Sequence, residues 1–217
     1  NRQMELGGYD SLSITILAAG FTGMVLSLQF AIGLEPFGAS MYTGKVVSLG
    51  IVRELGPVLT ALLVGGRVGS GYTAEIGSMN VTEQVDAIKA LGADPIRKLV
   101  MPRVVAMTIA MPLLTIVADI VGCAGGGFIT MIEVGVTWRF VFEQMVETLW
   151  IVDLLHGLSK SIFFGYLIGI IGCWNGLRTY GGTEGVGIAT TRTVVYISIS
   201  ILVSDFALTR IFLAIYG

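Results

Sequence analysis

Residues 11–34 form a long uncharged run, SLSITILAAGFTGMVLSLQFAIGL, and this run most constrains what the chain can fold into. A helix needs about 20 apolar residues to cross the hydrocarbon core of a bilayer. Because backbone groups in lipid have to bond within the chain, and the run is too long for a barrel strand, it predicts a transmembrane helix. Of the 217 residues, only 13% are charged, and the mean hydropathy is +0.83. Soluble domains have about 25% charged residues, so composition argues against a soluble enzyme.

Four further apolar stretches predict four more spans. They cover residues 46–66, 104–132, 151–177 and 193–216. The sequence therefore predicts an all-α fold: a polytopic membrane helix bundle with about five transmembrane helices in one transmembrane domain, residues 1–217.

Basic residues predict the orientation of this bundle. The connection 67–103 holds five Lys or Arg residues and 178–192 holds two, whereas 35–45 and 133–153 hold one each. The positive-inside rule then places 67–103 and 178–192 in the cytoplasm. With five spans, the N-terminus is also expected to be cytoplasmic.

A short cytoplasmic helix is predicted within the 67–103 connection. Asn80 and Glu83 have the spacing of an N-cap and its reciprocal partner, and Gly92 supplies the stop. Apolar residues recur at helical spacing, with charged residues away from that stripe. The apolar stripe is Val81, Val85, Ile88 and Leu91, and the charged residues are Glu83, Asp86 and Lys89. The helix is too short to span, so it lies at the membrane interface or docks a cytoplasmic partner.

Two adjacent charges, Arg53 and Glu54, interrupt the predicted second span. Each charge at the centre of a membrane helix costs about 2.5–3.5 kcal/mol on insertion scales, so such residues normally face a cavity or a partner. Pro57 offers no N–H to the carbonyl of Arg53 and crowds it, so we expect the helix to kink or open here. We favour a polar cavity over the alternative, in which Arg53 pairs with an acid elsewhere in the bundle.

Lys160, in the predicted fourth span, raises the same question. Two roles are open for it: neutralising Glu54, or helping to receive an anionic group. Asp119 and Asp205 are weaker candidates, and Arg210 is expected to extend outward near the end of its helix.

The sequence shows no catalytic or metal site of its own. His156 is the single histidine, and Cys123 and Cys173 lie in separate apolar stretches, so we expect buried side chains and no metal. The glycine-rich run at 181–187 lacks the GK[ST] ending that grips nucleotide phosphates. We therefore expect no cofactor in this chain and no nucleic acid, and any ATP hydrolysis has to come from another chain.

Pairs of glycines at GxxxG spacing indicate close helix packing, because small residues let backbones approach. They are Gly65–Gly69, Gly122–Gly126, Gly165–Gly169 and Gly172–Gly176.

The run RELGPVLTALLVGGRVGSGYTAEIGSMNVTEQVDAIKALGADPIRKLVMPR (53–103) resembles the MlaE/YrbE family of ABC-transporter permeases, as does ATTRTVV (189–195). The likeness extends over essentially the whole chain. Members of this family move phospholipids between the membranes of Gram-negative bacteria. The resemblance implies a permease domain over residues 1–217 that helps to maintain outer-membrane lipid asymmetry.

The resemblance also implies partners. Two copies would form a homodimer in the inner membrane, and each would dock a cytoplasmic ABC ATPase that uses ATP and Mg²⁺. A STAS-domain protein would bind the ATPase. A ring of MCE-domain proteins would lie on the periplasmic side, where the loop at about 133–150 is expected.

Position by position, the resemblance implies site residues. Arg53, Glu54 and Lys160 match polar residues of a phospholipid cavity at the dimer interface, and Leu26 matches its apolar wall. The residues that would dock the ATPase are Glu83, Asp86, Lys89 and Leu91. ATP binding by the partner would open or close the dimer through this helix and change the affinity of the cavity for lipid.

Two other function classes compete with this one. In a proton-coupled secondary transporter, Glu54, Asp119 or Asp205 would relay protons; no internal repeat supports this, and five spans do not divide evenly. In a non-transporting scaffold, the 67–103 connection would recruit a cytoplasmic protein. Charges inside the second and fourth spans argue against the scaffold, which has no evident use for them.

Overall fold

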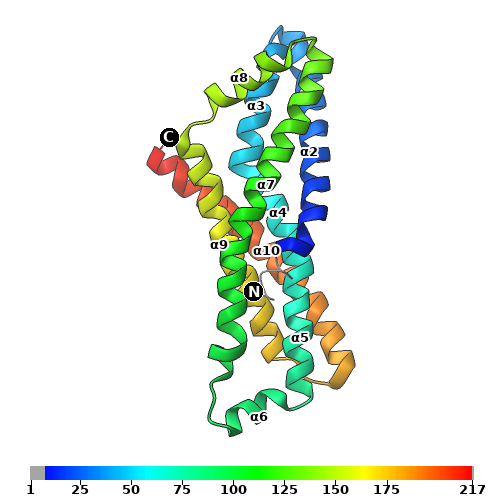
Figure 1. The fold of residues 1–217 in the computed structure, drawn as a ribbon, viewed down its shortest axis with the longest axis vertical. Coiled ribbons are helices and arrows are strands. Elements are labelled where there is room, and N and C mark those ends of the chain that lie inside the picture. Colours follow the sequence, from blue (N-terminus) through cyan, green and yellow to red (C-terminus); the bar gives the residue numbers. More distant parts are fainter. Residues whose placement is uncertain (1–7, 217) are drawn as a thin grey trace. The chain divides into compact units, whose positions relative to one another are not determined.

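A computed structural model describes residues 8–216, and these residues form helices joined by short connections, with no strand among them (Figure 1). In chain order the elements are α2 (Asp10–Leu34), η2 (Glu35–Phe37), η3 (Ser40–Tyr42), α3 (Thr43–Gly50), η4 (Ile51–Leu55), α4 (Gly56–Val64), η5 (Gly65–Gly69), α5 (Ser70–Val81), α6 (Gln84–Ala90), η6 (Ile96–Val100), α7 (Met101–Val134), α8 (Trp138–Thr148), α9 (Ile151–Leu177) and α10 (Gly182–Tyr216). Within the described part, five helical segments are long and apolar enough to cross a membrane. The predicted all-α bundle with about five spans is confirmed.

The second span is a composite helix that runs from Ser40 to Val81. Its α-helical pieces are joined by two wider, π-helical turns, η4 and η5. In η4 the N–H of Gly56 donates to the carbonyl of Ile51, five residues earlier, directly before Pro57. A π turn accommodates one extra residue without breaking the helix. The irregularity expected at Pro57 is therefore present, as a wider turn.

The connection between the second and third spans is shorter than the predicted 67–103. The helix of the second span continues through Val81, and the third span begins at Ile96. Both helices extend beyond the hydrophobic runs from which the spans were predicted. The predicted cap at Asn80 is wrong: Glu83 is the N-cap, with φ of 60°, and no side chain caps the helix. Asn80 instead donates through Nδ2 to the carbonyl of Thr179, at 2.9 Å. Gly92, with φ of 76°, follows the helix as predicted.

The region predicted as the loop 133–150 holds an amphipathic helix, α8. Val141 and Met145, four residues apart, are buried, and Trp138, Phe142 and Val146 are exposed. Gly135 precedes α8 with φ of 71°, a conformation that glycine adopts at no steric cost and that reverses the chain after α7.

The chain divides into two compact units. The first comprises residues 1–11, 61–112 and 160–217, and the second comprises residues 12–60 and 113–159. The helices α7 and α9 contribute residues to both units.

Close contact between α2 and α7 organises the second unit. A Cβ added to Gly23 would overlap the carbonyl oxygen of Gly122, so only glycine permits this approach. Nearby, the hydroxyls of Ser27 and Thr130 share a buried hydrogen bond of 2.7 Å. Buried hydroxyl pairs of this kind join membrane helices across small-residue contacts.

In the first unit, α5 lies beside the first half of α10 (Figure 1). The Thr73 hydroxyl on α5 lies 2.9 Å from the carbonyl of Gly172 on α9 and 2.8 Å from the hydroxyl of Thr193 on α10. One buried side chain thus joins three helices. The glycines of all four GxxxG pairs lie against a neighbouring helix, which confirms the predicted packing.

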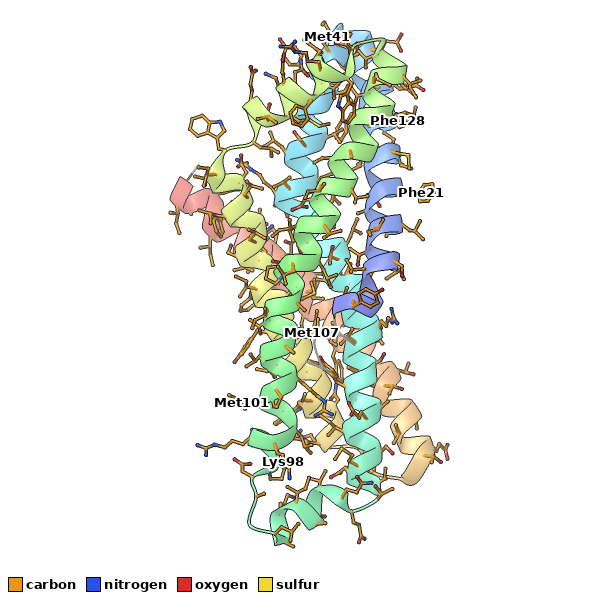
Figure 2. The ribbon with its side chains drawn as sticks, viewed as in Figure 1. Phe21, Met41, Lys98, Met101, Met107 and Phe128 are labelled. Atoms are coloured by element: carbon orange, nitrogen blue, oxygen red, sulfur yellow. The ribbon has the colours of Figure 1, made fainter. Side chains whose placement is uncertain are left out.

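The outward faces of the spans are apolar. Figure 2 shows Phe21 projecting from α2, and its side chain is exposed. Other exposed large apolar residues include Ile120, Phe128 and Val203. Figure 2 also shows Lys98 extending from the chain just before α7, where the span begins. An apolar exterior with charge near a helix end is typical of a protein surrounded by lipid.

Candidate functional site

Arg53 lies on the π-helical turn η4 and contacts Asp153 in the first turn of α9. Its Nε donates to Asp153 Oδ1 at 2.5 Å, and its Nη2 contacts the same oxygen. The Arg53 side chain is 43% exposed, whereas that of Asp153 is 3% exposed. The predicted alternative, in which Arg53 pairs with an acid elsewhere in the bundle, is therefore present, and the Arg53 side chain as a whole stays partly exposed.

Asp153 also caps α9. Its Oδ2 accepts a hydrogen bond of 2.9 Å from the backbone N–H of Trp150, which directly precedes the helix. Asp153 lies three residues after Trp150, the residue at the cap position, and this is the spacing of a capping box. The spacing can be seen in the sequence. Asp153, where the predicted connection 133–153 and the predicted span 151–177 overlap, was not among the predicted site residues. Its two carboxylate oxygens hold the helix end and Arg53 together.

A glycine allows α9 to reach the π turn. A Cβ added to Gly157 would overlap the backbone carbonyl oxygen of Val52, the residue before Arg53. Glu54 and Leu26, the other predicted cavity residues of this unit, are both half-buried. The structure thus joins Arg53 to α9 and leaves Glu54 and Leu26 partly accessible.

Lys160, in the other unit, is fully buried and paired. Its Nζ lies 2.8 Å from Asp205 Oδ1 and 2.6 Å from Thr209 Oγ1. Asp205 and Thr209 are four residues apart on α10, so they share one face of that helix. Removing a charge from water is compensated only by good geometry and further hydrogen bonds, and Lys160 has both. Of this group, Asp205 was a weaker candidate and Thr209 was not predicted.

Asp119 lies beside an apolar cavity of about 300 Å³ in the second unit. Cys123, Trp138 and Phe142 also line this cavity. The residue is 8% exposed, and Oδ1 has no hydrogen-bond partner in the described part of the chain. A Cβ added to Gly56 would overlap this oxygen, so the carboxyl group is seated against backbone.

The α6 segment presents its predicted docking residues outward. Val85 is buried, and Glu83, Asp86 and Lys89 are exposed, with an ion pair of 2.8 Å between Asp86 and Lys89. Leu91 is 85% exposed, although it was predicted on the apolar stripe with Val85. Leu91 is the C-cap of this helix, and its N–H still donates to the carbonyl of Ala87 at 3.1 Å, but its side chain lies outside the buried part of the stripe.

Comparison with known proteins gives the family. A model of the permease MlaE family matches residues 1–211. The chain belongs to the MlaE permease family. The match includes every residue discussed for Arg53, Lys160 and α6.

Individual relatives of this MlaE-family chain are ABC transporter permeases. It is 43% identical over 209 residues to a probable ABC transporter permease protein of Synechocystis, with 95% of this chain and 79% of that relative covered. It is 40% identical over 210 residues to a probable ABC transporter permease protein of Rickettsia typhi, covering 97% and 81%. It is 41% identical over 216 residues to the intermembrane phospholipid transport system permease protein MlaE of Haemophilus influenzae, covering 97% and 81%.

Proposed function

We propose that this chain is the permease subunit of an ABC transporter that moves phospholipids between the inner and outer membranes. The observation that carries the proposal is the Arg53 side chain, which is 43% exposed inside an apolar span and is paired with the buried Asp153. A guanidinium matches a phosphate group through its fork of donors. Family membership and the Haemophilus relative, whose name specifies phospholipid transport, support the same function.

The proposed cavity residues would each contact a different part of the phospholipid. Arg53 is placed to attract the phosphate, and Glu54 beside it would limit how tightly an anionic group is held. Leu26 on α2 would contact the acyl chains. Lys160 is buried against Asp205, so it would reach a headgroup only if that pair opened during transport.

We expect partner proteins to supply ATP hydrolysis and to exchange lipid with this chain. We expect a homodimer in the Gram-negative inner membrane, with the N-terminus cytoplasmic. A cytoplasmic ABC ATPase, carrying ATP and Mg²⁺, would dock on the exposed residues Glu83, Asp86, Lys89 and Leu91. A STAS-domain protein would bind the ATPase, and a periplasmic MCE-domain ring would receive or deliver the lipid.

Transport by the reconstituted complex tests this function. The chain would be purified with its co-purifying subunits, placed in proteoliposomes and supplied with fluorescent phospholipid. ATP should drive lipid movement, and a proton gradient alone should not. Glu54→Gln should slow transport several-fold, whereas Arg139→Gln, at an exposed site on α8, should not. Normal rates in Glu54→Gln and in Lys160→Ala would remove the cavity assignment, and transport driven only by protons would overturn the ABC assignment.

A further inference from the structure

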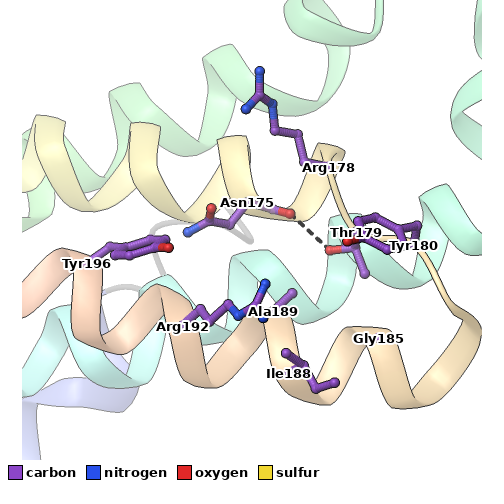
Figure 3. Close-up of a pocket in the computed structure, with 9 residues that line it drawn as sticks. All are labelled: Asn175, Arg178, Thr179, Tyr180, Gly185, Ile188, Ala189, Arg192 and Tyr196. Carbon is purple, nitrogen blue, oxygen red and sulfur yellow. Dashed lines mark hydrogen bonds between the residues drawn. The ribbon is translucent and has the colours of Figure 1, made fainter.

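A polar pocket lies between the end of α9 and the first turns of α10 (Figure 3). Its volume is about 280 Å³. The residues that line it are Asn175, Arg178, Thr179, Tyr180, Gly185, Ile188, Ala189, Arg192 and Tyr196. All of them belong to the first unit, and none is among the residues that we propose for the transport cavity.

The charge of this pocket is unbalanced. Arg178 and Arg192 line it, and no acidic residue does. Within residues 8–216, neither arginine forms an ion pair with a carboxylate. The acid nearest in sequence, Glu184, is exposed and does not line the pocket. A pocket with two positive charges and no counter-charge favours an anion.

The walls of the pocket are held in place by hydrogen bonds. The Thr179 hydroxyl donates to the carbonyl of Asn175 at 2.9 Å, and Asn175 Nδ2 donates to Thr193 Oγ1 at 3.0 Å. The first of these bonds is visible in Figure 3. The carbonyl of Thr179 is fixed in turn by Asn80 of α5. The walls are therefore preformed, and an anion would have to order only the arginine side chains.

The two guanidinium groups differ in position. Figure 3 shows Arg192 directed from α10 toward α9, on the side of Thr179, whereas the Arg178 side chain extends from α9 away from α10. Arg178 stacks on Trp174, with 3.9 Å between its Cζ and the ring centroid. Arg192 is therefore the expected direct ligand, and Arg178 contributes only the positive potential of a nearby charge.

We propose that this pocket binds a phosphate group, with Arg192 as the principal ligand. A guanidinium offers paired donors that match phosphate oxygens, and tyrosine hydroxyls add neutral donors. The proposal does not depend on lipid transport by this chain, because it concerns a separate site.

The surroundings favour a membrane lipid as the source of the phosphate. Trp174, Tyr180 and Tyr196 are all exposed around the pocket, which lies where two spans end. Tryptophan and tyrosine gather at the depth of the lipid headgroups. Basic pockets between membrane helices at that depth bind anionic headgroups. The expected ligand is the headgroup phosphate of an anionic glycerophospholipid in the surrounding leaflet.

Tryptophan quenching tests the proposal directly. The Trp138→Phe/Trp150→Phe variant leaves Trp174 as the single tryptophan, next to Arg178. The full chain in detergent would be titrated with brominated phosphatidylglycerol, with brominated phosphatidylcholine, and with inorganic phosphate followed by phosphatidylglycerol. We expect phosphatidylglycerol to quench at lower concentration than phosphatidylcholine, and inorganic phosphate not to prevent this.

Arginine variants in the same background locate the site. Arg192→Gln should weaken the phosphatidylglycerol response about tenfold, the effect of losing a charge-assisted hydrogen bond. Arg97→Gln removes one exposed arginine outside the pocket and should leave the response unchanged. Equal quenching by the two lipids, or an unchanged response in Arg192→Gln, would overturn the phosphate site. Complete competition by inorganic phosphate would overturn the lipid as its source.

Discussion

Two ion pairs place single charges inside apolar spans, and each joins residues far apart in the sequence. Arg53 pairs with Asp153, and Lys160 pairs with Asp205. In both pairs one member is almost completely enclosed, so the loss of its partner strands a charge away from water. The stability of the bundle should therefore be sensitive to these four residues.

Asp153→Asn should destabilise the protein by about 1–2 kcal/mol. The figure is below the 3–5 kcal/mol for breaking a fully buried pair, because Arg53 is half-exposed and screened by solvent. The amide also accepts the cap hydrogen bond of Trp150 less strongly than a carboxylate does. Thermal unfolding in detergent would measure the change, with Glu147→Gln, an exposed acid on α8, as the control. An equal melting temperature for the two variants would contradict the role of the pair.

Lys160→Met should destabilise the protein by about 3–5 kcal/mol, because it leaves Asp205 without its cation. The double variant Lys160→Met/Asp205→Leu should recover most of this loss, since apolar residues replace buried ion pairs at little cost. Lys98→Met, at an exposed site, serves as the control. Denaturant unfolding measures all three.

The double variant also separates structure from function. If Lys160 contacts lipid during transport, Lys160→Met/Asp205→Leu should be stable and still transport slowly. Stability and transport that recover together would show that the pair is structural only.

The sequence predicted that Arg53 is a charge inside an apolar span, but it did not predict which residue pairs with it. A charge followed by proline inside an apolar run is visible in one segment of sequence. Asp153 becomes its partner because Gly157 lets α9 approach the backbone of Val52. That approach depends on how the helices pack. The sequence alone does not give the distance between two helices, so it could not identify Asp153 as the partner of Arg53.

Helices of this protein are longer than the hydrophobic runs that identify them. The fourth span has its predicted bounds, Ile151–Leu177, and at its C-terminal end Arg178 and the Gly181-Gly182 pair follow closely. The second span extends to Val81 through Arg67 and Glu75, residues that pattern analysis assigned to a loop. Glu75 forms an ion pair of 2.7 Å with the buried Arg103 of α7, so this acid joins two helices although its own side chain stays partly exposed.

Glycine contacts between α2 and α7 allow a matched test. Gly23→Ala should destabilise the bundle by about 1–3 kcal/mol, because its Cβ meets backbone atoms of Gly122 that cannot move aside. Gly33→Ala lies on the same helix with nothing within 4 Å of the added Cβ. It should be neutral or stabilise by up to about 1 kcal/mol, through helix propensity. Unfolding in detergent compares them, and equal stabilities would refute the close contact.

At the scale of the whole molecule, the division into two units places the two ion pairs in different units. A transporter has to change shape while it remains folded, and units with separate internal packing can do so. The α6 segment belongs to the first unit, together with Lys160 and α10. A partner that pulls on α6 would therefore act on the unit that holds the Lys160 pair.

Leu91→Ser should weaken the proposed docking of an ATPase about tenfold, because Leu91 is the exposed apolar side chain among the proposed docking residues and its burial by a partner would be favourable. Met41→Ser removes another exposed apolar side chain, at the opposite end of the second span, and should have no effect. The yield of ATPase that co-purifies with each variant measures docking. Equal yields would place the interface elsewhere.

The π turn at Ile51–Leu55 has a consequence for how the chain tolerates changes in length. Such a turn is an α-helix with one residue inserted, so it can lose a residue and become regular again. Deleting one residue there should leave α3 and α4 folded, whereas the same deletion within α4 would rotate everything beyond it by about 100°. The wider turn that carries Arg53 would disappear, and with it the contact to Asp153. Sequences of different length at this point would thus share a fold while differing in whether the arginine of this span reaches the first turn of α9.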